Sequence, residues 1–230
     1  MKYKCIFFDL DHTLWDYETN SKETLAELYD QYALQQKGVT SVVDFQNRFR
    51  EVNTRLWDLF DRGEIKSEVI REQRFKQILE PFGAYQSKLC EDISVDYLNT
   101  CPTKGTLMPH ALDTLHYLKE KYTLTIITNG FEEIQNLKLT AGNLHPFFDH
   151  IVTSQRAGHR KPSREIFEFA LKHNTSECHE AIMIGDNLVT DIGGAMNASI
   201  DAVFFNPERF SHTVSVHHEI NSLDELRRIL

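Results

Sequence analysis

The sequence has little of what marks a membrane, secreted or thiolate-metal protein. Uninterrupted apolar runs end after about four residues, whereas a membrane helix requires about 20. The four cysteines form no close C-x-x-C pair, which argues against a thiolate zinc site or a redox pair, and the chain is long enough to build a core without disulfide bonds. An aspartate occurs before any signal-peptide core can form. We therefore expect a soluble, cytoplasmic protein with reduced thiols.

An excess of basic residues is also missing. The chain has 25 lysines and arginines against 34 aspartates and glutamates, a net charge of −9. This balance disfavours partners that are held through their phosphates, so we expect neither a nucleic acid polymer nor a membrane as a partner. The apolar content of 41% and charged content of 26% are typical of a folded globular protein, and the length corresponds to roughly one and a half domains.

What is present is an alternation of short apolar runs and amphipathic segments. Buried parallel strands are predicted at residues 5–8, 124–127, 151–152, 181–184 and 202–205. Helices are predicted at 113–121, ahead of the second strand, and at 131–144 and 162–173. This alternation predicts an α/β fold with a doubly wound parallel sheet.

The first two predicted strands are separated by more than one hundred residues, too many for a single crossover. Helical patterns fill the gap, with predicted helices at 21–36, where Asn20 and Glu23 have capping-box spacing, at 69–79 and at 89–98. A further helix is predicted from the apolar stripe of Phe45, Phe49, Val52, Leu56 and Phe60. We expect residues 16–104 to form an all-helical inserted domain and residues 1–15 and 105–230 to form the α/β core.

Carboxylates come directly after the first and fourth predicted strands. Asp9 and Asp11 leave the first strand, and Asp186 and Asp191 come after the fourth. Each pattern by itself also fits a solvated turn or a helix N-cap. The carboxyl ends of parallel strands, however, meet at the edge where open α/β sheets bind ligands.

Hydrogen-bond donors and cations come after the second and third predicted strands. Thr128, Asn129 and Gly130 combine a hydroxyl with free backbone amides ahead of a helix, which suits an anion; the alternative is an ordinary Asn-Gly turn. After the third strand, four cations occur within nine residues, at Arg156, Arg160, Lys161 and Arg164. This segment also fits a solvated basic loop.

The four features belong at one edge of the sheet, and their conjunction indicates a chemistry. Asp9, Asp11 and Asp186 would repel one another in one crevice, and a divalent cation would relieve that repulsion. An all-oxygen ligand set suits Mg²⁺. A carboxylate nucleophile, an acid/base, Mg²⁺ and a phosphate-binding turn together predict phosphoryl transfer.

These motifs resemble those of the haloacid dehalogenase superfamily, in order and across the whole predicted core: Asp9-x-Asp11-x-Thr13, Thr128, Lys161, and Gly185-Asp186 with Asp191. The helical insertion resembles a C1-type cap. Segments 127–131, 147–149 and 185–194 resemble the pyrimidine 5′-nucleotidases that act on non-canonical nucleoside monophosphates. His12 stands where many members have glycine, and we do not expect it to be catalytic.

The resemblance implies a role for each residue. Asp9 would attack phosphorus and form an aspartyl-phosphate, and Asp11 would act as general acid and then as general base. Thr128, the Asn129 amide and Lys161 would hold the phosphoryl oxygens. Mg²⁺ would be bound by Asp9, the Asp11 carbonyl oxygen and Asp186, with Asp191 in support. The substrate would be a small phosphomonoester, and the protein a monomer or homodimer.

Several alternatives remain open. A sugar-phosphate or phosphoglycolate phosphatase would carry the same core motifs, as would a phosphoglucomutase-like mutase. A 2-haloacid dehalogenase needs neither Mg²⁺ nor Asp11, and a non-catalytic binding module would have lost a catalytic residue. Trp15 and Arg160 are candidate substrate contacts, with hinge packing as the alternative for Trp15. We expect Arg74 on a solvated helix face, with a position that reaches the substrate pocket as the alternative.

Overall fold

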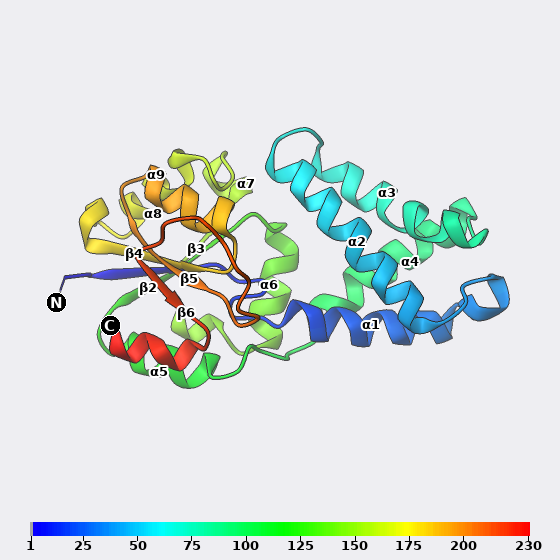
Figure 1. Ribbon diagram of the computed structural model, residues 1–230, viewed down its shortest axis with the longest axis horizontal. Helices are drawn as coiled ribbons and strands as arrows, with labels where there is room; N and C mark the ends of the chain where they lie inside the picture. The colour runs from blue at the N-terminus through cyan, green and yellow to red at the C-terminus, as the bar shows by residue number, and fades with distance from the viewer. Residues whose placement is uncertain (1) are drawn as a thin grey trace. The chain divides into compact units, whose positions relative to one another are not determined.

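The computed structural model describes residues 2–230, which form two compact units (Figure 1). The first, the α/β unit, contains the chain up to Tyr17 together with Gly105–Leu230. The second, the helical unit, contains Glu18–Lys104. The chain leaves the α/β unit after Tyr17 and returns to it at Gly105. The leaving and returning segments lie side by side within the α/β unit, where Trp15 and Leu107 form an antiparallel bridge.

A parallel sheet forms the centre of the α/β unit. Its strands are β1 (Cys5–Phe8), β2 (Thr123–Thr128), β3 (His150–Thr153), β4 (Ala181–Gly185), β5 (Asp201–Phe205) and β6 (His218–Ile220). Their order is β3-β2-β1-β4-β5-β6, with every pairing parallel. This confirms the predicted α/β fold and its doubly wound sheet. The edge strand β6 was not predicted, because its three residues include His218 and Glu219 and carry no apolar run.

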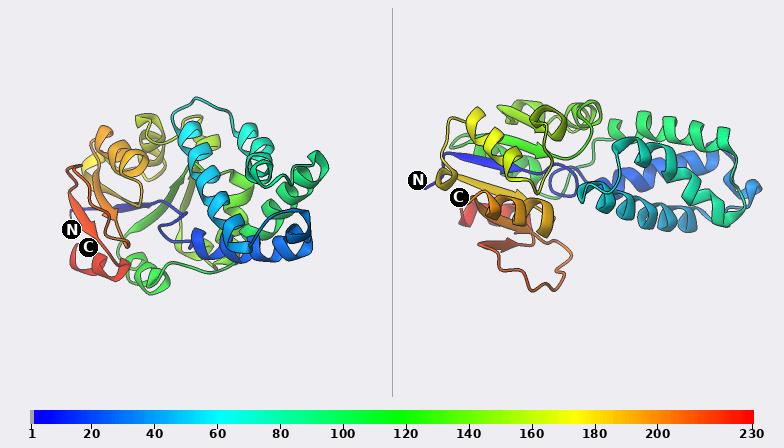
Figure 2. Two further views of the ribbon diagram at one scale, coloured as in Figure 1. Left: turned by 45° about the vertical axis from the view of Figure 1, so that its right-hand side comes forward. Right: turned by 90° about the horizontal axis from the view of Figure 1, so that it is seen from above.

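Helices cover both faces of this sheet (Figures 1 and 2). Cys5 and Phe7 of β1 pack in one buried cluster with Ile166, Phe167 and Ala170 of α8 (Arg164–His173). Helix α9 (Gly194–Asn197) contributes Ala195 to the same cluster. On the other face lie α5 (Ala111–Lys119) and the C-terminal 3₁₀ helix (Leu223–Arg228), which contact each other. Successive side chains of a strand point to opposite faces of the sheet. Because helices cover each face, the side chains on both faces are buried, as is usual for parallel sheets.

The remaining helices of this unit lie in the connections after β2, β3 and β4. They are α6 (Glu132–Ala141), α7 (Ser154–Ala157), a π-helix (Leu188–Gly193) and short 3₁₀ segments (His145–Phe147 and Cys178–Glu180). Helix α8 begins at Arg164, two residues after the predicted start at Pro162, because Ser163 is its N-cap.

The helical unit is built from α1 (Tyr17–Gln31), α2 (Val42–Asp61), α3 (Ser67–Leu79) and α4 (Ser87–Thr100). Short 3₁₀ segments follow α1 (Leu34–Lys37), α3 (Glu80–Phe82) and α4 (Cys101–Thr103). Four residues of the predicted apolar stripe of α2 are at most 2% exposed, whereas the fifth, Phe60 near the end of the helix, is only half-buried. The predicted capping box is wrong, because α1 begins at Tyr17 and Asn20 lies inside it, buried, with its carbonyl accepting the Thr24 hydroxyl at 2.9 Å. None of the helices within residues 2–230 is long and apolar enough to cross a membrane.

A buried arginine corrects the expectation of a solvated helix face at this position. Arg74 of α3 is only 4% exposed. Its guanidinium carbon lies 4.7 Å from the Tyr97 ring centroid and 5.4 Å from those of Phe49 and Phe75. Nη1 donates to Asn53 Oδ1 at 3.1 Å, while Nε and Nη2 are buried without a hydrogen-bond partner among residues 2–230.

Candidate active site

The site is set by where β1, β2 and β4 end. The register pairs Phe8, the last residue of β1, with Ile126 of β2 and Ile184 of β4. The Asp9 amide continues the ladder by donating to the Ile184 carbonyl at 2.9 Å. Parallel strands therefore deliver Asp9, Thr128 and Asp186 to one edge, as the sequence predicted.

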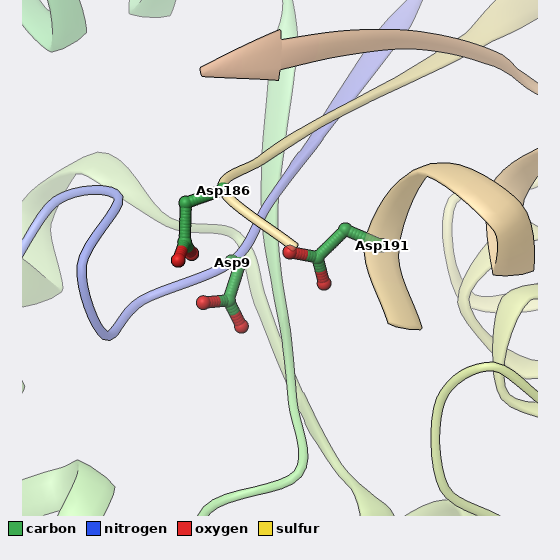
Figure 3. A group of neighbouring side chains, drawn as sticks. All are labelled: Asp9, Asp186 and Asp191. Atoms are coloured by element: carbon green, nitrogen blue, oxygen red, sulfur yellow. The ribbon is translucent and has the colours of Figure 1, made fainter. Parts of the chain in front are cut away.

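Three carboxylates converge at this edge (Figure 3). One oxygen each of Asp9, Asp186 and Asp191 lies within 4.8 Å of the others. Burial and the neighbouring carboxylates raise the pKa of Asp9 well above its ordinary value, although Lys161 opposes the shift. Burial and the Asp191 charge raise the pKa of Asp186 to about 7. The neighbouring protein groups, Lys161 included, therefore do not fully stabilise the negative charges of Asp9 and Asp186.

Lys161 is the cation inside this cluster. It is 2% exposed, and its Nζ lies 2.5 Å from Asp9 Oδ1 and 2.6 Å from Asp191 Oδ1. Burial would lower the pKa of this ammonium, but the charges of Asp191 and Asp9 outweigh burial and raise the pKa. Lys161 is therefore a fixed positive charge beside Asp9.

Asp191 is committed to protein contacts through both of its oxygens. Its Oδ2 accepts the Asn187 amide at 3.0 Å, while Oδ1 takes the Lys161 ammonium. It lies on the π-helix, a rare element that often marks functional positions. A Cβ on Gly185 would lie 2.3 Å from Asp191 Oδ2, so only glycine lets this side chain approach the end of β4.

The donor set suits a divalent cation. Lys161 takes one oxygen of Asp9, and the Thr13 hydroxyl donates to Asp186 Oδ1 at 3.1 Å. No side-chain hydrogen bond within residues 2–230 uses the second oxygen of either carboxylate. Asp9 and Asp186 therefore have oxygens available for a hard ion such as Mg²⁺, whereas the contacts of Asp191 suit a supporting position.

The Thr128 hydroxyl is available as a hydrogen-bond donor. Its oxygen accepts the Gly130 amide at 3.1 Å and Gln135 Nε2 at 2.7 Å. A hydroxyl has two acceptor positions and one proton. Both acceptor positions are taken, and no hydrogen bond within residues 2–230 uses the proton, which remains for a further acceptor. A phosphoryl oxygen is such an acceptor.

Asp11 is held by two residues that the sequence analysis did not identify. Lys138 Nζ lies 2.6 Å from Asp11 Oδ1, and Gln135 Nε2 lies 2.9 Å from Oδ2. Burial would raise the pKa of Asp11, but Lys138 and Gln135 outweigh burial and hold the pKa below its ordinary value. Asp11 is therefore ionised at neutral pH in this arrangement.

The orientation of α6 explains why these two residues were missed. The apolar Leu137 of α6 is 42% exposed, whereas the polar Gln135 and Lys138 are buried. Phe131, Gln135, Lys138 and Leu139 recur at spacings of four, three and one, which is one helical face. The sequence did contain a signal for the burial of Gln135 and Lys138, because both lie on the same helical face as the apolar Phe131 and Leu139.

The other residues singled out in the sequence lie around this site. His12 has φ 63°, the left-handed region that glycine favours, which gives a backbone reason for glycine at this position in other members. Arg160 is half-buried, directly before Lys161. Trp15 is fully buried with Lys138 Nζ 4.7 Å from its ring centroid. The burial of Trp15 favours packing, the alternative given above, over contact with a substrate.

Known hydrolases match this chain over most of its length. The family model of the haloacid dehalogenase-like hydrolases matches residues 3–199. The chain is 30% identical over 237 residues to pyrimidine 5′-nucleotidase YjjG of Escherichia coli (strain K12), covering 100% of this chain and 99% of that protein. It is also 30% identical over 224 residues to a glyceraldehyde 3-phosphate phosphatase of Methanothermobacter thermautotrophicus, covering 96% and 93%.

A solved structure gives the same assignment. The HAD-hydrolase YfnB from Bacillus subtilis, in a crystal structure bound to magnesium, superposes with a TM-score of 0.90 at 25% identity, covering 100% of this chain and 99% of that one. The resemblance inferred from the motifs is thereby confirmed, as is the expectation of an enzyme. The chain belongs to the haloacid dehalogenase-like hydrolases.

Proposed function

We propose that this enzyme is a Mg²⁺-dependent phosphomonoester hydrolase that works through an aspartyl-phosphate on Asp9. The observation that carries the proposal is the contact of Lys161 with Asp9 inside a trio of carboxylates. A buried carboxylate beside a fixed cation, at the edge of the sheet where ligands bind, has the surroundings that a nucleophile for a phosphate ester requires.

Two displacements account for the reaction. In the first, an Asp9 oxygen attacks phosphorus and the bond to the ester oxygen breaks; that oxygen takes the proton of the Asp11 carboxyl group and leaves as an alcohol. In the second, a water gives a proton to Asp11 and its oxygen attacks phosphorus, which breaks the bond to Asp9 and releases inorganic phosphate. Asp11 ends as it began. The negative charge of a bound phosphate favours the protonated form of Asp11 that the first step needs.

The phosphoryl group would be held by groups aimed at its oxygens. The Thr128 hydroxyl has its proton available, and we assign the Asn129 backbone amide as a second donor. Lys161 offsets the charge that develops on the oxygens. Asp9 and Asp186, with the Asp11 carbonyl oxygen, would hold Mg²⁺, and Asp191 would support them. When bound, the ion would supply Lewis-acid stabilisation of charge on the phosphoryl group.

For the substrate, we propose pyrimidine nucleoside 5′-monophosphates, including deoxy and base-modified ones. The similarity to pyrimidine 5′-nucleotidase YjjG supports this choice. We further propose that the helical unit, Glu18–Lys104, acts as the cap that selects the leaving group, and that Arg160 contributes to substrate binding. An equal identity to a glyceraldehyde 3-phosphate phosphatase makes a small sugar phosphate the second candidate.

A phosphate-release screen tests both proposals together. Nucleoside monophosphates, sugar phosphates, phosphoglycolate and p-nitrophenyl phosphate are compared with Mg²⁺ and with a chelator. We expect UMP or dUMP to give the highest kcat/KM and chelator to abolish turnover. A sugar phosphate that exceeds every nucleotide tenfold would favour the second candidate, and full activity in chelator would contradict the metal site.

Two variants test the assignment of the carboxylates. Asp9→Asn should form no phosphoenzyme when it is quenched in acid after mixing with ³²P-labelled substrate. Asp11→Asn retains the nucleophile and should lose about 10²–10⁴-fold in kcat, the usual contribution of general acid–base catalysis. An Asp9→Asn enzyme that still becomes labelled would contradict the assignment of the nucleophile.

A further inference from the structure

The two oxygens of Asp11 are held by two side chains from one helix face. Lys138 Nζ donates to Oδ1 at 2.6 Å and Gln135 Nε2 donates to Oδ2 at 2.9 Å. Both donors lie on α6, three residues apart, a spacing that places side chains next to each other. A carboxylate with a separate donor on each oxygen cannot rotate about its last bond without breaking a hydrogen bond.

Both donors are themselves fixed. Gln135 is fully buried, and Nε2 places its other hydrogen on Thr128 Oγ1 at 2.7 Å. Lys138 is 5% exposed, and its ammonium lies 4.7 Å from the ring centroid of Trp15 and 5.5 Å from that of Tyr17. A lysine held between a carboxylate and two rings has little freedom to serve another partner.

A glycine makes this arrangement possible. A Cβ on Gly130 would lie 2.3 Å from Gln135 Nε2 and 2.5 Å from its side-chain carbonyl carbon. The absence of a side chain at residue 130 therefore gives the Gln135 amide its path to both Thr128 and Asp11. One amide thus connects the hydroxyl proposed to bind phosphate with the carboxylate proposed to transfer protons.

The two buried lysines of the site have separate tasks. Lys161 contacts Asp9 and Asp191, whereas Lys138 contacts Asp11. Lys138 therefore acts through Asp11. We propose that Gln135 and Lys138 are positioning residues that hold the Asp11 carboxylate in the orientation needed for proton transfer, an inference that rests on the proposed phosphomonoester hydrolysis.

The leaving group of the substrate separates positioning of Asp11 from general damage to the site. The alkoxide released from UMP or glucose 6-phosphate needs a proton, whereas p-nitrophenolate leaves without one. The value of kcat/KM reports the steps up to cleavage of the ester bond. For Lys138→Met we expect kcat/KM for UMP and glucose 6-phosphate to fall at least tenfold, and that for p-nitrophenyl phosphate to fall less than threefold.

A second step gives an independent readout. Asp11 also activates the water that releases phosphate from Asp9. With ³²P-labelled p-nitrophenyl phosphate, which forms the phosphoenzyme without a proton from Asp11, Lys138→Met should therefore accumulate more acid-stable labelled phosphoenzyme than wild type in the steady state. Lys138→Arg, which restores a cation, should recover most of the leaving-group difference. Gln135→Ala should show the same selectivity to a smaller extent, and it provides a second variant if Lys138→Met does not fold.

A matched control is available on the surface. Lys121 Nζ lies 3.7 Å from the Tyr117 ring centroid, so Lys121→Met removes a lysine packed on an aromatic ring away from Asp11 and should leave both classes of substrate unaffected. Equal losses on alkyl and aryl esters, no loss on either, or a rise on the alkyl esters would each overturn the positioning role. A wild-type enzyme that releases phosphate from no ester would instead contradict the proposed function, so the two failures are distinguishable.

Discussion

Asn129 and Lys161 exchange two hydrogen bonds across the site. The Asn129 amide nitrogen Nδ2 donates to the Lys161 carbonyl oxygen at 2.9 Å, and the Lys161 backbone amide donates to Asn129 Oδ1 at 2.8 Å. The side chain after β2 thus fixes the backbone after β3. The position of the Lys161 ammonium beside Asp9 depends on this connection as well as on its own ion pairs.

Loss of this connection should weaken the site. Asn129→Leu removes both hydrogen bonds, each contributing about 0.5–1.5 kcal/mol, and frees the segment that carries Lys161. We expect kcat/KM to fall about tenfold, the loss that about 1.4 kcal/mol of transition-state stabilisation corresponds to. Steady-state kinetics measure the loss, and Asn136→Leu on α6 is the control because its side chain has no hydrogen bond to Lys161 within residues 2–230. Unchanged kinetics would mean that the ion pairs alone position Lys161.

Mg²⁺ should stabilise the protein more at pH 8 than at pH 6. The pKa of Asp186 is raised to about 7, above its value in the unfolded chain, so the folded metal-free protein takes up a proton as the pH falls. That proton stabilises the folded state, and the stabilisation is lost as the pH rises through about 7. Because the proton and the metal ion compete for the same carboxylate, the ion adds most where the proton is absent.

Thermal unfolding with Mg²⁺ or with chelator at the two pH values measures this difference. Asp186→Asn should remove most of the Mg²⁺ effect, and in chelator it should raise Tm relative to wild type more at pH 8 than at pH 6. A shift in Tm with Mg²⁺ that is equal at both pH values would contradict the role of this carboxylate.

Arg74 should be replaceable by an apolar side chain of similar length. A buried ion carries a desolvation penalty of several kcal/mol, and here the guanidinium has one hydrogen bond and three aromatic contacts, each worth about 0.5–2 kcal/mol. We expect Arg74→Met to be as stable as wild type or more stable, by up to a few kcal/mol. Arg74→Lys should be less stable, because an ammonium is more strongly hydrated and stacks poorly. Chemical denaturation of the two variants gives the comparison, and a strong loss in Arg74→Met would show that the charge itself stabilises the unit.

His12 should tolerate glycine but not a β-branched residue. Its φ of 63° is unfavourable for side chains by about 1–2 kcal/mol, and glycine removes that strain while losing the contact with the Tyr17 ring at 4.9 Å. We expect His12→Gly to remain within about 1 kcal/mol of wild-type stability and within a few-fold of its activity. His12→Val should lose about 1–2 kcal/mol. A large loss of activity in a stable His12→Gly variant would give the imidazole a role in the reaction.

The sequence alone determined the strands of the sheet other than the edge strand β6, and the edge at which the site forms. Short apolar runs specify the strands, and Asp9, Thr128 and Asp186 stand at or just beyond the carboxyl ends of three of them. Parallel strands bring those residues together whatever the details of packing. The motif residues Lys161 and Asp191 were found in the same way, because each lies a short distance along the chain from the end of a strand.

Only the tertiary structure decided how these groups are oriented and which others join them. Gln135 and Lys138 lie on the buried face of α6, and Leu137 on the exposed face, because the rotation of a helix about its axis depends on what it packs against. Arg74 is buried for a similar reason, since three aromatic rings from three helices surround it. The sequence reports the type and spacing of a residue, but partners distant along the chain decide whether a polar side chain faces water or the interior.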